Sequence, residues 1–589
     1  MNFFNNLIYF LTSKIKLWKN SKLIKKAIIG ITSFLVVLFL TALITYLIRI
    51  YEYENSFGEA IAFFVNSVLI GNFMGSVTIL IGSVVFGGYL VLGRSFSDSF
   101  LGMLKAMVGV IMLKIRAPTL INLARSVFSA LSNLGTSVIT LNPYFVLNDS
   151  ATWLKDFNAG YEAWISYAML LGFFVNILMV ALRKFTNMHS IMLTGHVMFQ
   201  QFAVVVPVVY FLIFYQKNVA INIDQIIAII LISSLILGLY WSVGTIATIK
   251  GADKITNNAG FAVGHQQMLG LSIAYGLGKF FGNVKDSAEV KKVSKKIKIF
   301  QDNIFTQSIL ILILFTIMIL IIQFSAIPAE KKDLVDKTRF INSNSQINKE
   351  FSEWNVDAQF WVINIILGSI KIVTSILIIQ TGIRMFVSEL QQSFQGISEK
   401  LVPGAVMSVD AAAMYGFSIN SVTYGFIPGT IAQYLAVGVL VGLSKASGGV
   451  IPIAIPLFIT LFFNSGSIGL YANASGGYKA AIIIPALFGF FEVLMIAFGI
   501  FALRAHAGAI NSSDSFPFRT GFLGMFDWNF FFGLSLLVAS WTKELSIIIF
   551  AFVIPILLVL LSQIIDSNRQ SKITFMQRLF KVKVNLLTK

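Results

Sequence analysis

Runs of apolar residues long enough to cross a lipid bilayer recur along the whole chain. A transmembrane helix needs about 20 predominantly apolar residues, and hydropathy identifies such segments. The composition agrees, because 57% of the residues are hydrophobic, only 12% are charged and the mean hydropathy is +0.82. We predict an all-α polytopic membrane protein with about 12 transmembrane helices. The apolar runs lie near 27–49, 60–93, 106–130, 163–182, 197–215, 225–248, 303–324, 360–381, 405–443, 449–464, 478–504 and 530–565.

The basic residues gather in short loops rather than on one soluble surface. The net charge is +18, and residues 1–26 hold six lysines and no acid, 283–299 hold six lysines against two acids, and 567–589 hold six basic residues and no acid. Positive-inside bias explains such loops better than nucleic-acid binding does. We therefore predict a cytoplasmic N-terminus over 1–26, a cytoplasmic tail over 566–589 and no nucleic-acid partner. The balanced loop 326–357 is predicted to be extracellular.

The sequence also argues against disulfides, metal sites and a cleaved leader. It contains no cysteine, and none of its four histidines has a second histidine at metal-ligand spacing, so we predict no metal. The first apolar run, 27–49, is about as long as a membrane span and lacks a clear small-x-small cleavage site. It is interpreted as an additional N-terminal transmembrane anchor.

Two glycine-rich segments interrupt the pattern of plain spans. Residues 257–282 contain six glycines, and residues 403–429 contain four glycines with prolines at both ends. Irregular backbone at membrane depth is tolerated only where protein or a water-filled cavity surrounds it, and in transporters paired interruptions mark the substrate site. We predict broken or re-entrant segments around such a site. The alternative is that these glycines allow close packing of helices.

An apolar stripe precedes the second interruption. Its residues recur at spacings of three and four, which predicts an amphipathic helix over 383–401. That helix follows the span 360–381 and is expected at the cytoplasmic face. The stripe consists of Ile383, Val387, Leu390, Phe394, Ile397 and Leu401.

Asp410 is the only formally charged residue between Leu401 and Ser444. An acid inside the membrane is costly and is by default a candidate functional residue. It could accept a hydrogen bond from a substrate hydroxyl or couple transport to a proton or sodium ion. The structural alternatives are an ion pair with Arg384 and a cap on a half-helix. Glu492 is a second buried acid, interpreted as structural because no other strongly polar residue accompanies it.

Two histidine–glutamine pairs are candidates for binding a solute. His196 and Gln200 share a helix face, since they are four residues apart. His265 and Gln266 lie in the first glycine-rich interruption. Imidazole and amide groups both donate and accept hydrogen bonds, which suits a polyhydroxylated solute. For the first pair, a hydrogen bond that joins neighbouring helices is the alternative.

These segments resemble one family, the ascorbate-type membrane component (enzyme IIC) of the bacterial phosphoenolpyruvate-dependent sugar phosphotransferase system. The resemblance covers roughly residues 55–565. Its motifs are long and ungapped, and they occur in the family's order. Several of them contain runs of polar residues, which unrelated apolar segments would not share by chance. They are IMLTGHVMFQQ (191–201), GFAVGHQQ (260–267), FQDNI (300–304), TGIRMFVSELQQSFQGIS (381–398), LVPGAVMSVDAAAMYGFSINSVTYGF (401–426) and GMFDW (524–528).

The resemblance implies a multi-pass homodimer in the bacterial cytoplasmic membrane, surrounded by lipid. Each protomer is expected to have a core domain that holds a sugar acid, with L-ascorbate as the expected substrate, and a dimerisation domain. Uptake would be coupled to phosphorylation of the incoming solute. The phosphoryl group would come from a phosphorylated IIB protein, which receives it from a IIA protein. Both are expected as separate chains. No cofactor and no covalent catalytic residue of this chain is implied.

The family's substrate-binding positions can be carried over residue by residue. The resemblance implies that Asp410 accepts a hydrogen bond from a substrate hydroxyl and that the two histidine–glutamine pairs contact the ring oxygens of the substrate. The implied site residues are Pro143, Tyr144, His196, Val197, Met198, Phe199, Gln200, His265, Gln266 and Asp410.

The chain departs from the family in an early helix. Lys114-Ile-Arg-Ala-Pro118 stands where relatives carry small and polar residues that face the ligand, so Arg116 could favour a more anionic solute. The anchor 27–49 and the long loop 326–357 are also additions. Two other functions stay open on the residues alone. One is an ion-coupled secondary carrier with Asp410 as the ion site, and the other is a membrane scaffold that does not transport.

Overall fold

The chain divides into two compact units. The first comprises Met1–Ile111 with Gly382–Pro403, and the second comprises Met112–Thr381 with Gly404–Lys589. The computed structural model describes residues 39–53, 56–64, 68, 76–133, 137–157, 162–216, 219–291, 302–324, 354, 361–509, 516–518, 521–570 and 572–582. Residues 27–38 of the predicted anchor 27–49, and all of the loop 326–357 except Trp354, therefore lie outside the described residues.

The first unit is built from helices. They are an apolar helix at Phe39–Tyr51, α3 (Phe57–Phe63), α4 (Val77–Val91), the beginning of α5 (Phe96–Asn133) and the end of α15 (Trp361–Leu401). Helix α3 begins at a capping box, in which Ser56 and Glu59 each accept from the other's backbone N–H. Helices α5 and α15 each contribute residues to both units.

The predicted amphipathic helix 383–401 is not a separate element. The span 360–381 and the amphipathic stretch form one helix, α15, which runs without interruption from Trp361 to Leu401. It ends just before Pro403, because a residue preceding proline is disfavoured in helical geometry. Its buried face includes Leu390 of the predicted stripe and also Glu389, which accepts from the Tyr89 hydroxyl and lies 3.8 Å from the Lys105 ammonium.

The second unit contains most of the long apolar helices. Among the described residues, six helices are long and apolar enough to span a membrane, and six shorter apolar helices accompany them, which indicates an integral membrane protein. The helices of this unit are α6 (Pro143–Phe157), α7 (Glu162–Ala181), α8 (Arg183–Thr186), α9 (Gly195–Val209), η2 (Tyr210–Phe214), α10 (Ile223–Thr256), α11 (Met268–Phe281), η3 (Ala288–Val290), α13 (Asn303–Phe324), η7 (Ala411–Phe417), α16 (Ile419–Ala446), α17 (Phe458–Thr460), η8 (Leu461–Ser465), α18 (Gly466–Ala509), η10 (Asp527–Phe532), α19 (Gly533–Ala539), α20 (Lys543–Ile547), η11 (Ile548–Val553), α21 (Ile554–Ile564) and α22 (Phe575–Leu579), together with the parts of α5 and α15 outside the first unit.

The prediction of an all-α fold is wrong in one respect, because the second unit contains six short strands. They form two three-stranded parallel sheets, ordered β5-β1-β6 and β2-β4-β3. Strands of two to four residues are too short to produce an alternating pattern that the sequence could reveal. The strands are β1 (Val138–Leu141), β2 (Ser190–Ile191), β3 (Ala262–Val263), β4 (Val406–Val409), β5 (Ile453–Pro456) and β6 (Gly521–Phe522).

The strands correct the interpretation of several apolar runs. The run 449–464 is not one continuous helix, because it contains β5, and from Phe458 onward it belongs to the candidate span Phe458–Gly508. Both predicted interruptions contain irregular backbone, but each is shorter than expected: α11 resumes at Met268 and α16 begins at Ile419. The run 530–565 holds two helical segments, separated by a turn at Ser540–Thr542.

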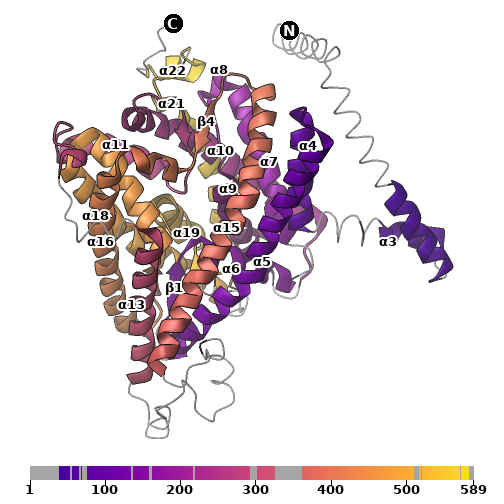
Figure 1. Cartoon of the computed structure of the whole chain (residues 1–589), viewed down its shortest axis with the longest axis horizontal. Coiled ribbons are helices and arrows are strands. Elements are labelled where there is room, and N and C mark those ends of the chain that lie inside the picture. Colours follow the sequence, from indigo (N-terminus) through magenta and orange to yellow (C-terminus); the bar gives the residue numbers. More distant parts are fainter. Residues whose placement is uncertain are drawn as a thin grey trace. The chain divides into compact units, whose positions relative to one another are not determined.

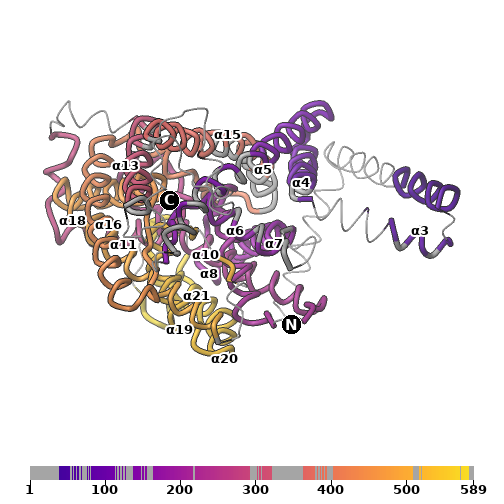
Figure 2. Tube along the Cα trace, turned by 90° about the horizontal axis from the view of Figure 1, so that it is seen from below, coloured from indigo at the N-terminus to yellow at the C-terminus, as the bar shows by residue number. Residues whose placement is uncertain are grey.

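Helices α16 and α18 pack side by side, and both views show them with α11 beside them (Figures 1 and 2). Glycines allow this approach, because a Cβ on Gly425 would lie 2.7 Å from Cα of Gly469. The packing alternative is therefore correct for Gly425, whose predicted role was to interrupt a helix. Within α18, Gly477 forms a kink with φ of +70°, which favours glycine.

Replacing Gly469 with valine is expected to destabilise the protein by about 1–3 kcal/mol or more, because a side chain there would overlap the α16 backbone. The thermal midpoint of the purified protein, followed by size-exclusion chromatography after heating, should fall. Gly276→Ala is the matched control, since nothing lies within 4 Å of a Cβ built at that glycine. Equal midpoints for Gly469→Val and the parent would contradict the helix packing described above.

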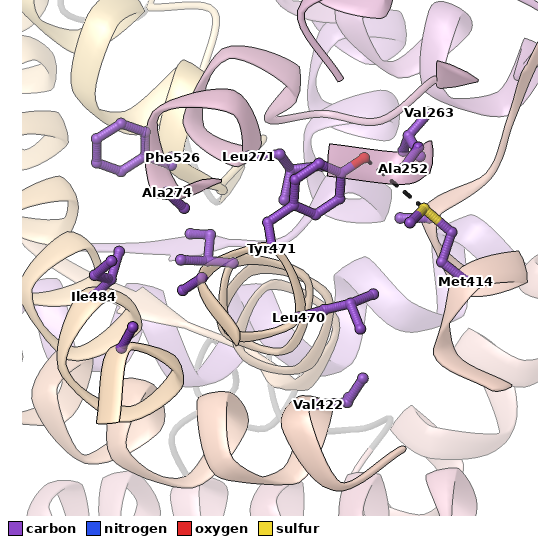
Figure 3. Close-up of a cluster of buried hydrophobic side chains, with 14 residues drawn as sticks. Ala252, Val263, Leu271, Ala274, Met414, Val422, Leu470, Tyr471, Ile484 and Phe526 are labelled. Atoms are coloured by element: carbon purple, nitrogen blue, oxygen red, sulfur yellow. Dashed lines mark hydrogen bonds between the residues drawn. The ribbon is translucent and has the colours of Figure 1, made fainter. Parts of the chain in front are cut away.

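A buried apolar cluster joins the elements that carry the candidate site. Tyr471 of α18 lies at its centre, and its hydroxyl donates to the carbonyl of Thr248 at 3.2 Å and contacts Met414 Sδ (Figure 3). Leu271 of α11 and Val263 of β3 belong to the same cluster. Because Met414 follows Asp410 by four residues and Leu271 follows His265 by six, this cluster holds both candidate segments against α18.

Candidate functional site

Three distant segments of the chain meet in the sheet β2-β4-β3. Ser190 pairs with Val406 in β2 and β4, and Ala262 pairs with Ser408 in β3 and β4, with all three strands parallel. The carboxyl ends of parallel strands lie at the same edge of a sheet, which is where ligands bind in many open sheets. The candidate residues His196, His265 and Asp410 all come shortly after these carboxyl ends.

Hydrogen bonds at this edge connect the three loops. The Thr194 hydroxyl donates to the carbonyl of Gly264 at 2.8 Å, and the N–H of Leu193 donates to the Ser408 hydroxyl at 2.9 Å. The N–H of Gly264 donates to the carbonyl of Val409 at 2.8 Å. Glycine is required at position 264, because a Cβ there would lie 2.2 Å from Thr194 Oγ1. The loops are therefore held in one arrangement.

His196 and Asp410 form a pair at this edge. Nε2 of His196 lies 3.1 Å from Oδ2 of Asp410, and both side chains are partly exposed, at 22% and 33%. The other carboxylate oxygen accepts from the N–H of Ala412 at 3.0 Å and so caps the 3-10 helix η7. The capping role considered for Asp410 is thus present. Because one oxygen caps the helix and the side chain remains partly exposed, the carboxylate has acceptor capacity for a ligand.

The second pair of candidate side chains is more deeply buried. The Gln266 amide donates to Gln200 Oε1 at 2.7 Å, and both side chains are almost inaccessible. His265 is also buried. Among the described residues, neither Nδ1 of His265 nor Oε1 of Gln266 has a hydrogen-bond partner. Buried polar atoms normally have partners, so these two are available to a bound molecule.

Gln201 was not among the predicted site residues, yet it fixes the loop that carries His265. Its amide nitrogen lies 3.5 Å from the carbonyl oxygen of His265, and its Oε1 accepts from the indole of Trp241 at 2.6 Å. In the sequence, the only sign of a role for Gln201 was that it directly follows Gln200 in the motif MFQQ. Gln200 and Gln201 point to different neighbours, so the first meets Gln266 and the second supports His265.

Tyr415 is a further residue that sequence reasoning missed. Its hydroxyl lies 2.8 Å from the Ser467 hydroxyl, and its ring stacks on Phe463 at 5.9 Å between centroids. The ring of Phe463 in turn lies 6.4 Å from that of His265. Only its position five residues after Asp410 could have indicated it.

The remaining predicted residues fall into two groups. Val197 and Met198 are buried within α9, whereas Phe199 is half-buried, one turn from His196. Pro143 and Tyr144 begin α6 and follow β1, so they stand at the carboxyl end of the other sheet.

Helix α6 is joined to α9 by an unusual hydrogen bond. The Ser150 hydroxyl donates to the carbonyl of Ala203. Pro207 lies four residues after Ala203 and has no N–H, so this carbonyl lacks its usual helical partner. The contact ties the helix that begins at Pro143 to the helix that begins beside His196.

The altered stretch Lys114–Pro118 lies in the interior of α5, which continues to Asn133. The side chains of Lys114, Arg116 and Pro118 lie outside the described part of the structure. The orientation of Arg116 toward or away from a ligand therefore stays a prediction.

Comparison with known proteins gave two matches. A family model described as the sugar-specific permease component of the PTS system matches residues 72–533. The chain is also 38% identical to the "Ascorbate-specific PTS system EIIC component" of Mycoplasma pneumoniae, in an alignment that covers 98% of this chain and 99% of that protein. The similarity therefore includes the N-terminal and C-terminal regions as well as the sheets.

Proposed function

The chain belongs to the family of sugar-specific permease components of the phosphotransferase system, and from this premise we propose that it takes up L-ascorbate or a related sugar acid. The family resemblance noted in the sequence is thereby confirmed. Membership implies a sugar substrate and cooperation with other components of that system. The proposed specificity for ascorbate rests on the ascorbate-specific relative from Mycoplasma pneumoniae, which aligns with nearly the whole chain.

One observation supports binding of a polyhydroxylated solute at the edge of the sheet β2-β4-β3. His196, His265 and Asp410 converge there, and a buried imidazole nitrogen and a buried amide oxygen have no partner among the described residues. Such a set can both donate to and accept from hydroxyl and ring oxygens. Asp410 is assigned to a substrate hydroxyl, and the two histidine–glutamine pairs are assigned to the ring oxygens.

The phosphoryl group is proposed to come from a separate, phosphorylated IIB protein at the cytoplasmic face. A hydroxyl oxygen of the sugar forms the new bond to phosphorus as the bond to the IIB side chain breaks, and the hydroxyl proton passes to the departing IIB side chain. The three basic segments support this placement of the cytoplasmic face, since they attract anionic groups and mark the inner side. A IIA protein would recharge IIB.

The assembly is proposed to be a homodimer in the bacterial cytoplasmic membrane, with both termini in the cytoplasm. The division of the chain into two units supports a core domain distinct from a dimerisation domain. A tag at the N-terminus should react with a membrane-impermeant reagent only in inverted vesicles. Labelling of intact cells would overturn this orientation.

The decisive experiment measures uptake of radiolabelled L-ascorbate into vesicles that contain the purified protein. Label should accumulate as a phosphate ester when phosphorylated IIB is enclosed, and not when unphosphorylated IIB is enclosed. Accumulation of unmodified ascorbate driven by a sodium or proton gradient would instead support a secondary carrier. Failure to bind any anionic sugar, with the protein folded, would support the scaffold alternative.

A further inference from the structure

Four fully buried polar side chains converge in the second unit, away from the sheet edge described above. They are Gln433 of α16, Asn464 of η8, Glu492 of α18 and Asn529 of η10, and each is 0% exposed. Glu492 was expected to have no strongly polar neighbour, and that expectation is wrong. An isolated carboxylate among membrane-spanning helices is costly, so its surroundings need a physical explanation.

Asn464 is the direct partner of Glu492. Its amide nitrogen donates to Glu492 Oε1, and its amide oxygen accepts from the N–H of Phe526 at 3.2 Å. These two contacts fix which end of the amide faces the acid. The second carboxylate oxygen, Oε2, has no hydrogen-bond partner among the described residues.

Gln433 approaches the same place from α16. Its amide nitrogen donates to the hydroxyl of Ser465, the neighbour of Asn464, at 2.9 Å. Its Cγ lies 2.7 Å from where a Cβ on Gly489 would be, one helical turn before Glu492. The absence of a side chain at Gly489 therefore admits Gln433 to this cluster. Its amide oxygen has no partner among the described residues.

The packing register places Asn529 at the level of Glu492. Phe488 stacks on Phe526 with 4.1 Å between ring centroids, and further along the same two segments a Cβ on Gly499 would lie 2.6 Å from the carbonyl oxygen of Gly533. The two segments thus run in parallel. Asn529 follows Phe526 by one turn, as Glu492 follows Phe488. Both amide atoms of Asn529 lack partners in the described structure.

The unpaired atoms are mainly oxygens. Gln433, Glu492 and Asn529 each contribute one, against a single unpaired N–H group, the amide of Asn529. No salt bridge joins Glu492 to a basic side chain in the described part of the chain. Asn464 and Asn529 both lie in π-helical turns, which occur frequently at functional sites. Hard cations prefer such oxygen ligands, and a single positive charge would balance the one carboxylate.

We propose that Gln433, Glu492 and Asn529 bind a monovalent alkali cation, with Asn464 holding the carboxylate in position. The site is separate from the proposed sugar site but is connected to it. The amide of Gln267 donates to the carbonyl of Asn464 at 2.9 Å, and Gln267 directly follows Gln266. The cation thus lies behind the loop that carries the second histidine–glutamine pair.

The test is binding of ²²Na⁺ and ⁸⁶Rb⁺, an analogue of K⁺, to the purified full-length protein in lipid nanodiscs without sugar. Saturable binding of one of these ions at one per chain is expected. Glu492→Gln should weaken that binding about tenfold or more, the scale for losing a charged partner. Glu544→Gln, which changes an exposed acid at the start of α20, should leave it unchanged.

Gln433→Met provides a second variant, because it keeps the size of the side chain and removes the oxygen. It should also weaken binding, and a monodisperse elution profile would establish that the variant is folded. Absence of saturable binding of both ions to the parent would overturn the cation site. So would ions that bind the parent and both folded variants with equal affinity. Neither result depends on ascorbate, so the uptake experiment is judged separately.

Discussion

Asp410→Asn is expected to weaken binding of L-ascorbate about ten- to a hundred-fold. A hydrogen bond to a charged group contributes on the order of 1.5–3 kcal/mol, and asparagine removes the charge. Asparagine is a good helix N-cap, so the contact with the N–H of Ala412 should survive and the 3-10 helix η7 should remain intact. Equilibrium binding of radiolabelled ascorbate to the purified protein measures the change.

Asp224→Asn is the matched control for that variant. Asp224 is an exposed acid in the first turn of α10, and its replacement removes the same charge without touching the sheet edge. The affinity of the Asp224→Asn variant for ascorbate should equal that of the parent protein. Unchanged affinity in Asp410→Asn, with the thermal midpoint also unchanged, would remove Asp410 from the proposed site.

The second large effect is expected from Asp527→Ala, on stability rather than on binding. Asp527 is buried, and its carboxylate accepts from the Tyr240 hydroxyl at 2.6 Å and from the N–H groups of Leu269 and Gly270 at 2.9 and 2.7 Å. Alanine would leave the two N–H groups unpaired, whereas the Tyr240 hydroxyl keeps the carbonyl of Gln266, at 3.2 Å, as an acceptor. At about 1–3 kcal/mol for each unpaired N–H group, the loss is a large fraction of the stability of a typical protein.

The expected result for Asp527→Ala is a large fall in the thermal midpoint or loss of monodisperse protein. Asp527→Asn should lie between alanine and the parent, because one acceptor remains to cap the start of α11. Size-exclusion chromatography after heating compares all three. An alanine variant as stable as the parent would show that these hydrogen bonds contribute little to folding. The GMFDW motif would then need another explanation.

The candidate site could be predicted in part because its polar residues stand out against an apolar background. His196, His265 and Asp410 lie in segments almost free of other charged groups. Because polar and ionisable side chains inside a membrane are costly, the presence of each one there indicated a function. The structure places these three residues at one sheet edge. The pairing of His196 with Asp410 was not foreseen, since Asp410 had been considered as a partner of Arg384.

Glu492 illustrates the limit of such reasoning. Its immediate neighbours in the sequence are apolar, which led to the interpretation of an unaccompanied acid. Its actual neighbour, Asn464, is 28 residues away, and Gln433 is further still. Hydropathy along the chain reports what surrounds a residue in sequence, whereas burial cost depends on what surrounds it in space.

The sequence by itself determined the class of the protein, the existence of its long helices and the chemical groups of its candidate site. Apolar runs set the first two, because the bilayer requires a minimum length of apolar helix. Only the tertiary structure decided that Ile191 pairs with Met407 and Val263 with Val409 in one sheet, and that Gly425 allows helices to pack rather than breaking one. Pairing of strands two to four residues long depends on backbone hydrogen bonds between segments far apart in the chain, which leave no period in the sequence. The separation of paired residues runs from 146 residues, for Ala262 and Ser408, to 381 residues, for Thr140 and Gly521.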